Sequence, residues 1–258
     1  MSLKALIFDV DGTLADTERN GHRIAYNRAF ERMGIGWNWS ETTYGELLAV
    51  SGGKERMKYF IENYQPEIPA DRAIEELIAD IYYTKTKIFK EMLLSGLIPL
   101  RSGVERLFNE AREAGIRLAI ATTTAPSNIK YLLTSNLGET SLQWFDIIAA
   151  GDIVENKKPS PEIYHYVLQE MGLKGEECVA FEDSEIGCLS ATGAGIPVII
   201  TVNDYTRDEP FTSASLVLDQ LGDPDVPVEL INDPQGTFDG TMLSIDYLTS
   251  NYGLLATG

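Results

Sequence analysis

Two carboxylates follow the first apolar run of the chain. Asp9 and Asp11 stand two residues apart, directly after Leu6, Ile7 and Phe8, in the stretch "FDVDGTLAD". In an extended chain, residues i and i+2 point the same way, so both side chains can face one crevice. Two neighbouring negative charges repel each other, so the pair needs a chemical reason for its position.

Other polar residues stand at the ends of later apolar runs. Thr122 ends "LAIAT", Lys158 lies in "NKKPSPEIY", and Glu182 and Asp183 follow the run in "VAFEDS". Taken singly, they fit a turn hydroxyl, a solvated charge and a helix N-cap region. In open α/β sheets, however, ligands bind beyond the carboxyl ends of the strands. Acids, a hydroxyl and a cation at such ends together predict one site.

The motif "DVDGT" alone allows three other interpretations. It fits a surface Asp-Gly turn, and it fits a receiver-like signalling domain with carboxylates at strand ends. A calcium-binding EF-hand loop requires Gly at its sixth position and Glu at its twelfth. Here Gly12 is fourth and Asn20 is twelfth, which excludes the EF-hand.

The composition limits the kind of metal. The chain has 258 residues, two cysteines (Cys178 and Cys188) and two histidines (His22 and His165). A zinc cluster or a multi-histidine site is excluded by these counts. Oxygen ligands point instead to a hard cation such as Mg²⁺.

The charge and hydropathy limit the partners. A net charge of −18 argues against a nucleic-acid partner, which needs clustered Lys and Arg. No stretch reaches the roughly 20 apolar residues of a membrane helix. We therefore expect no nucleic-acid partner and no membrane span. We also expect a monomer and a cytoplasmic location.

Strands and helices are predicted to alternate over most of the chain. Nearly continuous apolar runs are typical of strands covered on both faces. These runs are Ala5–Phe8, Ile116–Thr122, Phe145–Ala150, Cys178–Phe181, Ile196–Thr201 and Leu216–Leu218. Helical patterns at Gly103–Ala114, Pro161–Met171 and Ser184–Thr192 are each followed by a glycine that can end a helix. Residues 222–240, rich in Asp, Pro and Gly, are predicted to be an irregular surface excursion.

A helical insert interrupts this alternation. From Asp16 to Leu97 the patterns are helical: Thr17–Met33, Glu55–Tyr64 and Asp71 to about Leu94. The sequence therefore predicts an α/β fold, with a Rossmann-like, mostly parallel sheet core and an inserted all-helical cap domain. The core would comprise residues 1–15 and 98–258, and the cap residues 16–97.

The four motifs, in this order, resemble those of the haloacid dehalogenase superfamily of phosphatases and phosphomutases. "DVDGT" is similar to its first motif, Thr122 to its second, Lys158 to its third and "ED" at 182–183 to its fourth. The insert resembles the small cap of that superfamily. More narrowly, "GTLADTERNGHR" and "AVSGGKERM" resemble CbbY-like sugar-bisphosphate phosphatases. That resemblance implies a ketose bisphosphate substrate such as xylulose-1,5-bisphosphate.

The resemblance implies a role for each core residue. Asp9 would attack phosphorus to form an aspartyl phosphate, and Asp11 would act as general acid and then base. Mg²⁺ would be held by Asp9, Asp183 and the main-chain carbonyl of Asp11. Glu182 would be either a further ligand or a residue that orients the ligands from behind, and we favour the second role. Thr122 would hold the phosphoryl oxygens, and Lys158 would balance charge.

The cap and one core residue would bind the rest of the substrate. In "SGGKER" (Ser51–Arg56), main-chain N–H groups with Lys54 and Arg56 would suit a second phosphate; an ordinary helix start is the alternative. Further contacts are expected from Gly53, Lys85, Glu18, His22, Tyr44 and Thr123.

Two rival activities remain open at this point. A phosphomutase of the β-phosphoglucomutase kind would share the aspartyl phosphate, although such mutases often have an apolar residue at the position of Thr13. A receiver-like signalling module is more distant, because it would need neither an acid–base Asp11 nor a cap. A dehalogenase also has no use for Asp11.

Overall fold

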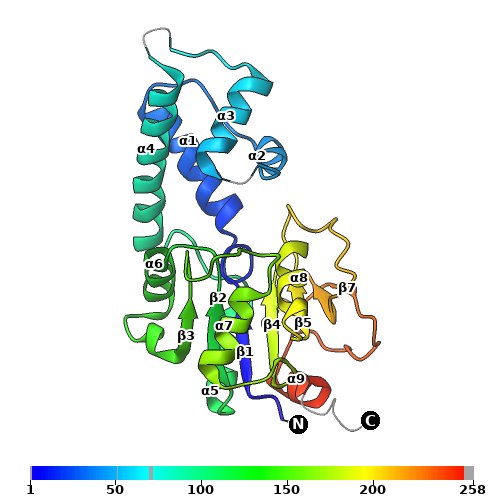
Figure 1. Ribbon diagram of the computed structural model, residues 1–258. Coiled ribbons are helices and arrows are strands. Elements are labelled where there is room, and N and C mark those ends of the chain that lie inside the picture. Colours follow the sequence, from blue (N-terminus) through cyan, green and yellow to red (C-terminus); the bar gives the residue numbers. More distant parts are fainter. Residues whose placement is uncertain (1, 51, 70–71, 253–258) are drawn as a thin grey trace. The chain divides into compact units, whose positions relative to one another are not determined.

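The computed structural model describes residues 2–50, 52–69 and 72–252 (Figure 1). The chain divides into two compact units, Met1–Asp16 with Pro99–Gly258, and Thr17–Ile98. We call the first the core and the second the cap. These boundaries differ by one residue from the expected ones.

A seven-stranded sheet forms the centre of the core, in the order β3-β2-β1-β4-β5-β6-β7. The strands are β1 (Ala5–Phe8), β2 (Arg117–Ala121), β3 (Phe145–Ala149), β4 (Cys178–Glu182), β5 (Val198–Thr201), β6 (Leu216–Leu218) and β7 (Leu230–Asn232). Neighbouring strands pair in parallel except β6 and β7, which pair antiparallel. The predicted mostly parallel α/β sheet is confirmed.

Both faces of the central strands are buried. Ala5 and Ile7 of β1 share an apolar cluster with side chains of two helices on one face of the sheet, α7 (Glu162–Met171) and α8 (Glu185–Gly193). On the opposite face, the ring of Phe8 stacks on Phe181. The Phe8 ring also meets the edge of Phe108 in α5 (Val104–Glu113). Burial on both faces explains why β1 reads as a continuous apolar run.

The remaining core helices lie between or after the strands. They are α6 (Pro126–Leu137), α9 (Ile245–Tyr252) and the short 3₁₀ turns η2 (Ser141–Trp144) and η3 (Gly175–Glu177). The sequence analysis named neither α6 nor α9.

Two predictions about the core were wrong in detail. Residues 222–240 are not wholly irregular, because β7 (Leu230–Asn232) extends the sheet edge there. Gly193 was expected to end a helix in the left-handed region, but it is the last residue of α8. The left-handed glycine is Gly195, at φ +75°.

All the regular secondary structure in the described residues of the cap is helical. Its elements are η1 (Glu18–His22), α1 (Arg23–Arg32), α2 (Glu41–Leu47), α3 (Gly53–Tyr64) and α4 (Ile74–Leu94). The expected helix over Thr17–Met33 begins as one π-helical segment, η1, before α1. The sequence analysis missed α2, and the expected helix start at Asp71 lies outside the described residues.

Aromatic side chains form much of the cap interior. Trp39 is fully buried and its ring contacts those of Tyr26, Phe30 and Phe60.

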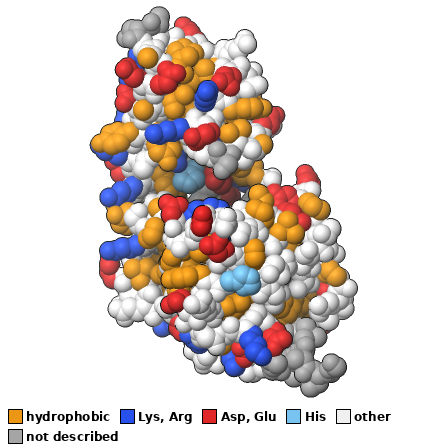
Figure 2. Space-filling view, viewed as in Figure 1, with side chains coloured by type: hydrophobic (Ala, Val, Ile, Leu, Met, Phe, Trp, Pro, Cys, Tyr) orange, Lys and Arg blue, Asp and Glu red, His pale blue; other side chains and the backbone are white. Residues whose placement is uncertain are grey.

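No helix within the described ranges is long and apolar enough to cross a bilayer. Figure 2 shows Lys and Arg side chains interspersed with Asp and Glu over the viewed face.

Candidate active site

Strand register brings three of the four motifs together at the carboxyl ends of the central strands of the core sheet. Phe8 at the end of β1 pairs with Ile120 on one side and with Phe181 on the other. The residues that follow these positions, Asp9, Thr122 and Glu182 among them, therefore emerge side by side. The main-chain N–H of Asp9 donates to Phe181 O at 3.0 Å, which continues the pairing beyond the strand.

Lys158 connects Asp9 of the first motif to Glu182 of the fourth. Its Nζ donates to Asp9 Oδ1 at 2.7 Å, Glu182 Oε1 at 2.6 Å and Ala121 O at 2.9 Å. Three acceptors use all three N–H bonds of an ammonium group. Tyr164 in α7 donates to the same Glu182 Oε1 at 2.5 Å. Lys158 is therefore oriented toward Asp9 by several partners at once.

Burial and charge perturb these groups in opposite directions. Burial by itself lowers the pKa of Lys158, but Asp9 and Glu182 outweigh it and raise that pKa above its ordinary value. Burial raises the pKa of Glu182 to about 7, although Lys158 opposes the rise. For Asp183, burial and the charges of Asp9 and Glu182 raise the pKa well above its usual range.

Asp183 lies in a tightly enclosed position. Asn203, two residues after β5, donates from Nδ2 to Asp183 Oδ2 at 2.7 Å. Gly12 has φ +87°, and a Cβ there would lie 2.1 Å from the same oxygen. Only glycine fits at this position, for conformational and steric reasons alike.

Asp11 has a partner that the sequence analysis did not name. Thr124 donates its hydroxyl hydrogen bond to Asp11 Oδ2, which orients this carboxyl group. The expected phosphate-binding residue Thr122 is buried, and its Oγ1 accepts from the N–H of Thr124 at 3.3 Å. Thr123 is exposed in the same turn.

The donor set fits a divalent cation. Single carboxylate oxygens of Asp9, Glu182 and Asp183 all lie within 4.8 Å of one another, and all three residues are buried. Burial, together with the charges of Asp9 and Glu182, raises the pKa of Asp183, and a bound cation would favour the ionised carboxylate instead. Oxygen ligands suit Mg²⁺. Because Glu182 Oε1 already accepts from Lys158 and Tyr164, Glu182 fits a place behind the ligands better than among them.

Several of the expected substrate residues meet one another within the cap. The Tyr44 hydroxyl donates to Glu18 Oε2 at 2.5 Å and accepts from Arg56 Nη1 at 2.8 Å. Burial and the Glu18 charge raise the pKa of Tyr44 well above its ordinary value. Lys85 Nζ lies 2.9 Å from His22 Nδ1. Burial, with the charges of Lys85 and Arg56, lowers the pKa of His22 well below 6.5.

Two tyrosines border Gly53, the first residue of α3. The Tyr26 hydroxyl donates to Gly53 O at 3.0 Å, and a Cβ on Gly53 would lie 2.7 Å from the Tyr82 ring. Lys54 is exposed, with Nζ 5.4 Å from the centre of that ring. Ser51, the first residue of "SGGKER", lies outside the described residues.

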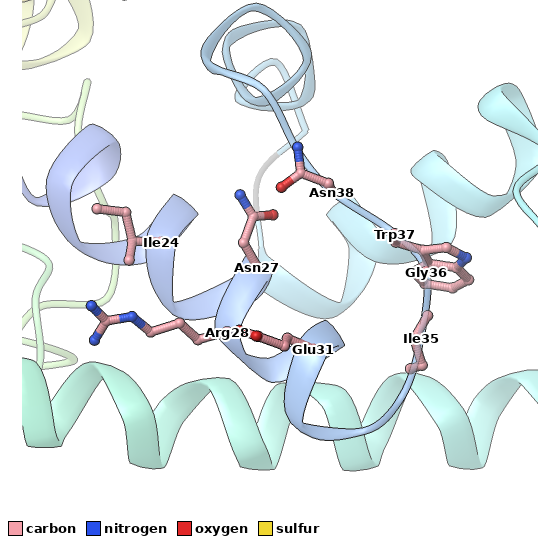
Figure 3. A pocket seen from close by; sticks show the side chains of 8 residues that line it. All are labelled: Ile24, Asn27, Arg28, Glu31, Ile35, Gly36, Trp37 and Asn38. Carbon is pink, nitrogen blue, oxygen red and sulfur yellow. The ribbon is translucent and has the colours of Figure 1, made fainter.

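A separate surface pocket of about 370 Å³ lies within the cap, between α1 and the segment that follows it (Figure 3). None of the expected substrate residues lines this pocket. The Asn27 amide on its wall is already engaged, donating to Trp39 O at 2.9 Å and accepting from Trp39 N at 2.8 Å. We therefore do not assign the site to this pocket.

Four core residues near the motifs escaped the sequence analysis: Thr124, Tyr164, Asn203 and Arg101. Arg101 Nη2 donates to Val202 O at 2.6 Å and Asp219 O at 2.5 Å, and Nη1 donates to Thr201 O at 2.8 Å and to Gly12 O. Only the run of three threonines at 122–124 offered a signal, since any of the three could have been the relevant hydroxyl. Tyr164 was indistinguishable from a core aromatic in an amphipathic helix.

Comparison of the sequence with known proteins gives a family match. The sequence profile of the haloacid dehalogenase-like hydrolases matches residues 3–195. Protein CbbY of Cupriavidus necator is 42% identical over 226 residues, covering 88% of this chain and 89% of that protein. A phosphatase of phosphorylated carbohydrates from Thermotoga maritima is 30% identical over 207 residues, covering 80% and 88%.

A solved structure extends the likeness to the fold. The crystal structure of a CbbY variant from Rhodobacter sphaeroides, in complex with xylulose-1,5-bisphosphate, matches with 44% identity and a TM-score of 0.71. The match covers 85% of this chain and 95% of that one. The chain therefore belongs to the haloacid dehalogenase-like hydrolase family, in its CbbY group, and is an enzyme of the phosphatase kind.

Proposed function

We propose that the protein is a Mg²⁺-dependent sugar-phosphate phosphatase that works through an aspartyl phosphate on Asp9, with a ketose bisphosphate such as xylulose-1,5-bisphosphate as substrate. The observation that carries this proposal is the convergence of Asp9, Lys158 and Asp183 at one edge of the sheet. The CbbY relative bound to that bisphosphate supports the substrate class.

In the first step, a carboxylate oxygen of Asp9 attacks phosphorus, and the bond from phosphorus to the sugar oxygen breaks. Asp11, held by Thr124, gives its proton to the leaving oxygen. Lys158 supplies positive charge beside Asp9. Thr122 and the N–H groups of the turn after β2 provide donors for the phosphoryl oxygens.

In the second step, water attacks the phosphorus of the aspartyl phosphate. Asp11, now ionised, takes the proton of that water, and the bond from phosphorus to Asp9 breaks, which restores both carboxyl groups. Asp9, Asp183 and the Asp11 main-chain carbonyl would hold Mg²⁺, whose charge offsets that of the phosphoryl group.

The cap offers a second set of residues suited to a dianion. The N-terminus of α3 presents main-chain N–H groups after two glycines, and exposed Lys54 lies in its first turn. Arg56 Nη1 donates a hydrogen bond to the Tyr44 hydroxyl and lies 3.8 Å from Glu18 Oε2. Because Arg56 already has these partners, we assign the contact that selects the substrate mainly to Lys54. Glu18, His22, Tyr44 and Lys85 would then contact the sugar or shape its surroundings.

The test compares Lys54→Ala with Lys58→Ala, a control one turn later on α3 whose lysine is also exposed. Lys54→Ala should lower kcat/KM for xylulose-1,5-bisphosphate at least tenfold and leave p-nitrophenyl phosphate within twofold. Lys58→Ala should change neither. Equal losses on both substrates would remove Lys54 from substrate selection.

The alternative activity is separated in the same assays. A β-phosphoglucomutase-like enzyme would convert sugar phosphates without releasing phosphate to water. Phosphate release that matches substrate consumption, over a panel of sugar mono- and bisphosphates, supports the phosphatase. Formation of an isomerised sugar phosphate without free phosphate would instead show that the enzyme is a mutase.

A further inference from the structure

Asn203 is a polar residue of the core for which neither the motifs nor the reaction steps require a role. It follows β5 by two residues and is partly buried. Its Nδ2 lies 2.7 Å from Asp183 Oδ2. An amide that donates a hydrogen bond to one oxygen of the Asp183 carboxylate can fix the orientation of that carboxylate.

The direction of the Asn203 amide is determined by its own turn. Its Oδ1 accepts from the N–H of Tyr205 at 2.9 Å, and its main-chain N–H donates to Thr206 Oγ1 at 3.1 Å. A reversed amide would lose the bond to Tyr205 and place its oxygen against a carboxylate. The turn therefore presents the nitrogen to Asp183.

Asp183 has little freedom to turn away from this donor. A Cβ placed on Gly12 would come within 2.1 Å of Asp183 Oδ2 and 2.9 Å of Asn203 Nδ2. The three groups are thus packed to the limit that a glycine permits. Asn203 and Gly12 together enclose one oxygen of Asp183.

We propose that Asn203 is a positioning residue, which holds the Asp183 carboxylate in its cation-binding orientation. This inference rests on the proposed function, in which Asp183 binds Mg²⁺. Groups that hydrogen-bond a metal ligand from behind orient it, and their removal typically weakens metal affinity by roughly 10–100-fold. Asn203→Ala should weaken cation binding on that scale.

The experiment measures Mn²⁺ binding to the full-length protein by electron paramagnetic resonance, without substrate or turnover. Asn203→Ala removes the bond to Asp183. Asn203→Ser also removes it but keeps a side-chain acceptor for the Tyr205 N–H, so it serves if the alanine variant does not fold. Thr206→Val is the matched control, because it loosens the same turn without touching Asp183.

The expected result is a dissociation constant at least tenfold higher in both Asn203 variants and within twofold of wild type in Thr206→Val. Wild-type affinity in a folded Asn203 variant would overturn the inference. So would an equal loss in Thr206→Val, since it would mean that the turn alone matters. Wild-type protein that binds no Mn²⁺ would instead refute the proposed metal dependence, which keeps the two failures distinct.

Discussion

The ammonium nitrogen of Lys158 lies 2.7 Å from Oδ1 of Asp9, and both side chains are almost completely shielded from solvent. The contact joins residues that stand far apart in the chain.

The first prediction concerns the two aspartates of the first motif. Asp9→Asn should abolish turnover without altering the fold, because an amide cannot attack phosphorus. Asp11→Asn should slow turnover by roughly 10²–10⁴-fold, the usual contribution of a positioned acid–base group. Steady-state kinetics and far-UV circular dichroism measure both. Appreciable activity in Asp9→Asn would exclude it as the nucleophile.

The second prediction concerns Lys158. Lys158→Met leaves Glu182 buried without its cation, and breaking a buried pair typically costs about 3–5 kcal/mol of unfolding free energy. Urea unfolding above pH 7, in the presence of a chelator, should show this loss of unfolding free energy in Lys158→Met. The exposed neighbour supplies the control Lys157→Met, which should stay within about 0.5 kcal/mol of wild type.

The raised pKa of Glu182 determines how the free energy of unfolding depends on pH. Glu182 has a folded-state pKa of about 7, above its ordinary value near 4.5, so the folded state binds its proton more tightly than the unfolded state does. Stability from this group is therefore greatest below pH 4.5 and falls as pH rises to 7. Without Lys158 the decline should continue above pH 7. A variant whose stability is independent of pH between 6 and 8 would contradict this.

The third prediction concerns Gly187 in α8. A Cβ there would lie 1.9 Å from Glu182 Oε2, so Gly187→Ala must displace the carboxylate that holds Lys158. We expect a loss of about 1–3 kcal/mol of unfolding free energy and at least a tenfold loss of kcat. Gly193→Ala, on the same helix, meets only Pro161 at 3.3 Å and should keep its kcat. Equal kcat in the two variants would refute the steric argument.

The fourth prediction concerns His22 in the cap. Its Nδ1 faces the Lys85 ammonium, so the ring must be neutral to accept that hydrogen bond. Its lowered pKa means that the unfolded state takes up this proton first as pH falls. Stability should therefore decline below about pH 6.5, by at most about 1.4 kcal/mol per pH unit.

In the variant His165→Gln, His22 is the only remaining histidine of the printed sequence. Its ring signals in ¹H–¹³C NMR should stay those of a neutral imidazole well below pH 6.5. A midpoint at or above 6.5 would show that burial and the Lys85 contact do not lower the pKa of His22.

The sequence predicted the sheet well where its strands are buried. Ala5–Phe8 and Leu216–Leu218 have the predicted bounds, because continuous apolar residues leave little choice of structure. Leu230–Asn232 was missed since this edge strand is short, largely exposed and set among turn residues. Local pattern carries no information about a strand whose formation depends on pairing with a distant edge.

The site residues that were predicted are those placed by local sequence pattern, and the site residues that were missed depend on contacts between distant parts of the chain. Asp9, Thr122 and Asp183 directly follow strands, so strand order alone places them near one another. Tyr164 and Asn203 act through contacts to Glu182 and Asp183 that exist only after the helices and loops have packed. Nothing in the residue types distinguishes them beforehand.

The anchoring of Arg101 explains how the core can tolerate so large an insertion. Its main-chain N–H donates to Leu14 O at 2.8 Å, so the two chain segments that flank the insertion are tied together within the core itself. The entropy of closing the intervening loop is then offset by core contacts and grows only slowly with loop length. We therefore expect that insertions of different length and composition at this point leave unchanged the pairing of β1, which ends directly before Asp9.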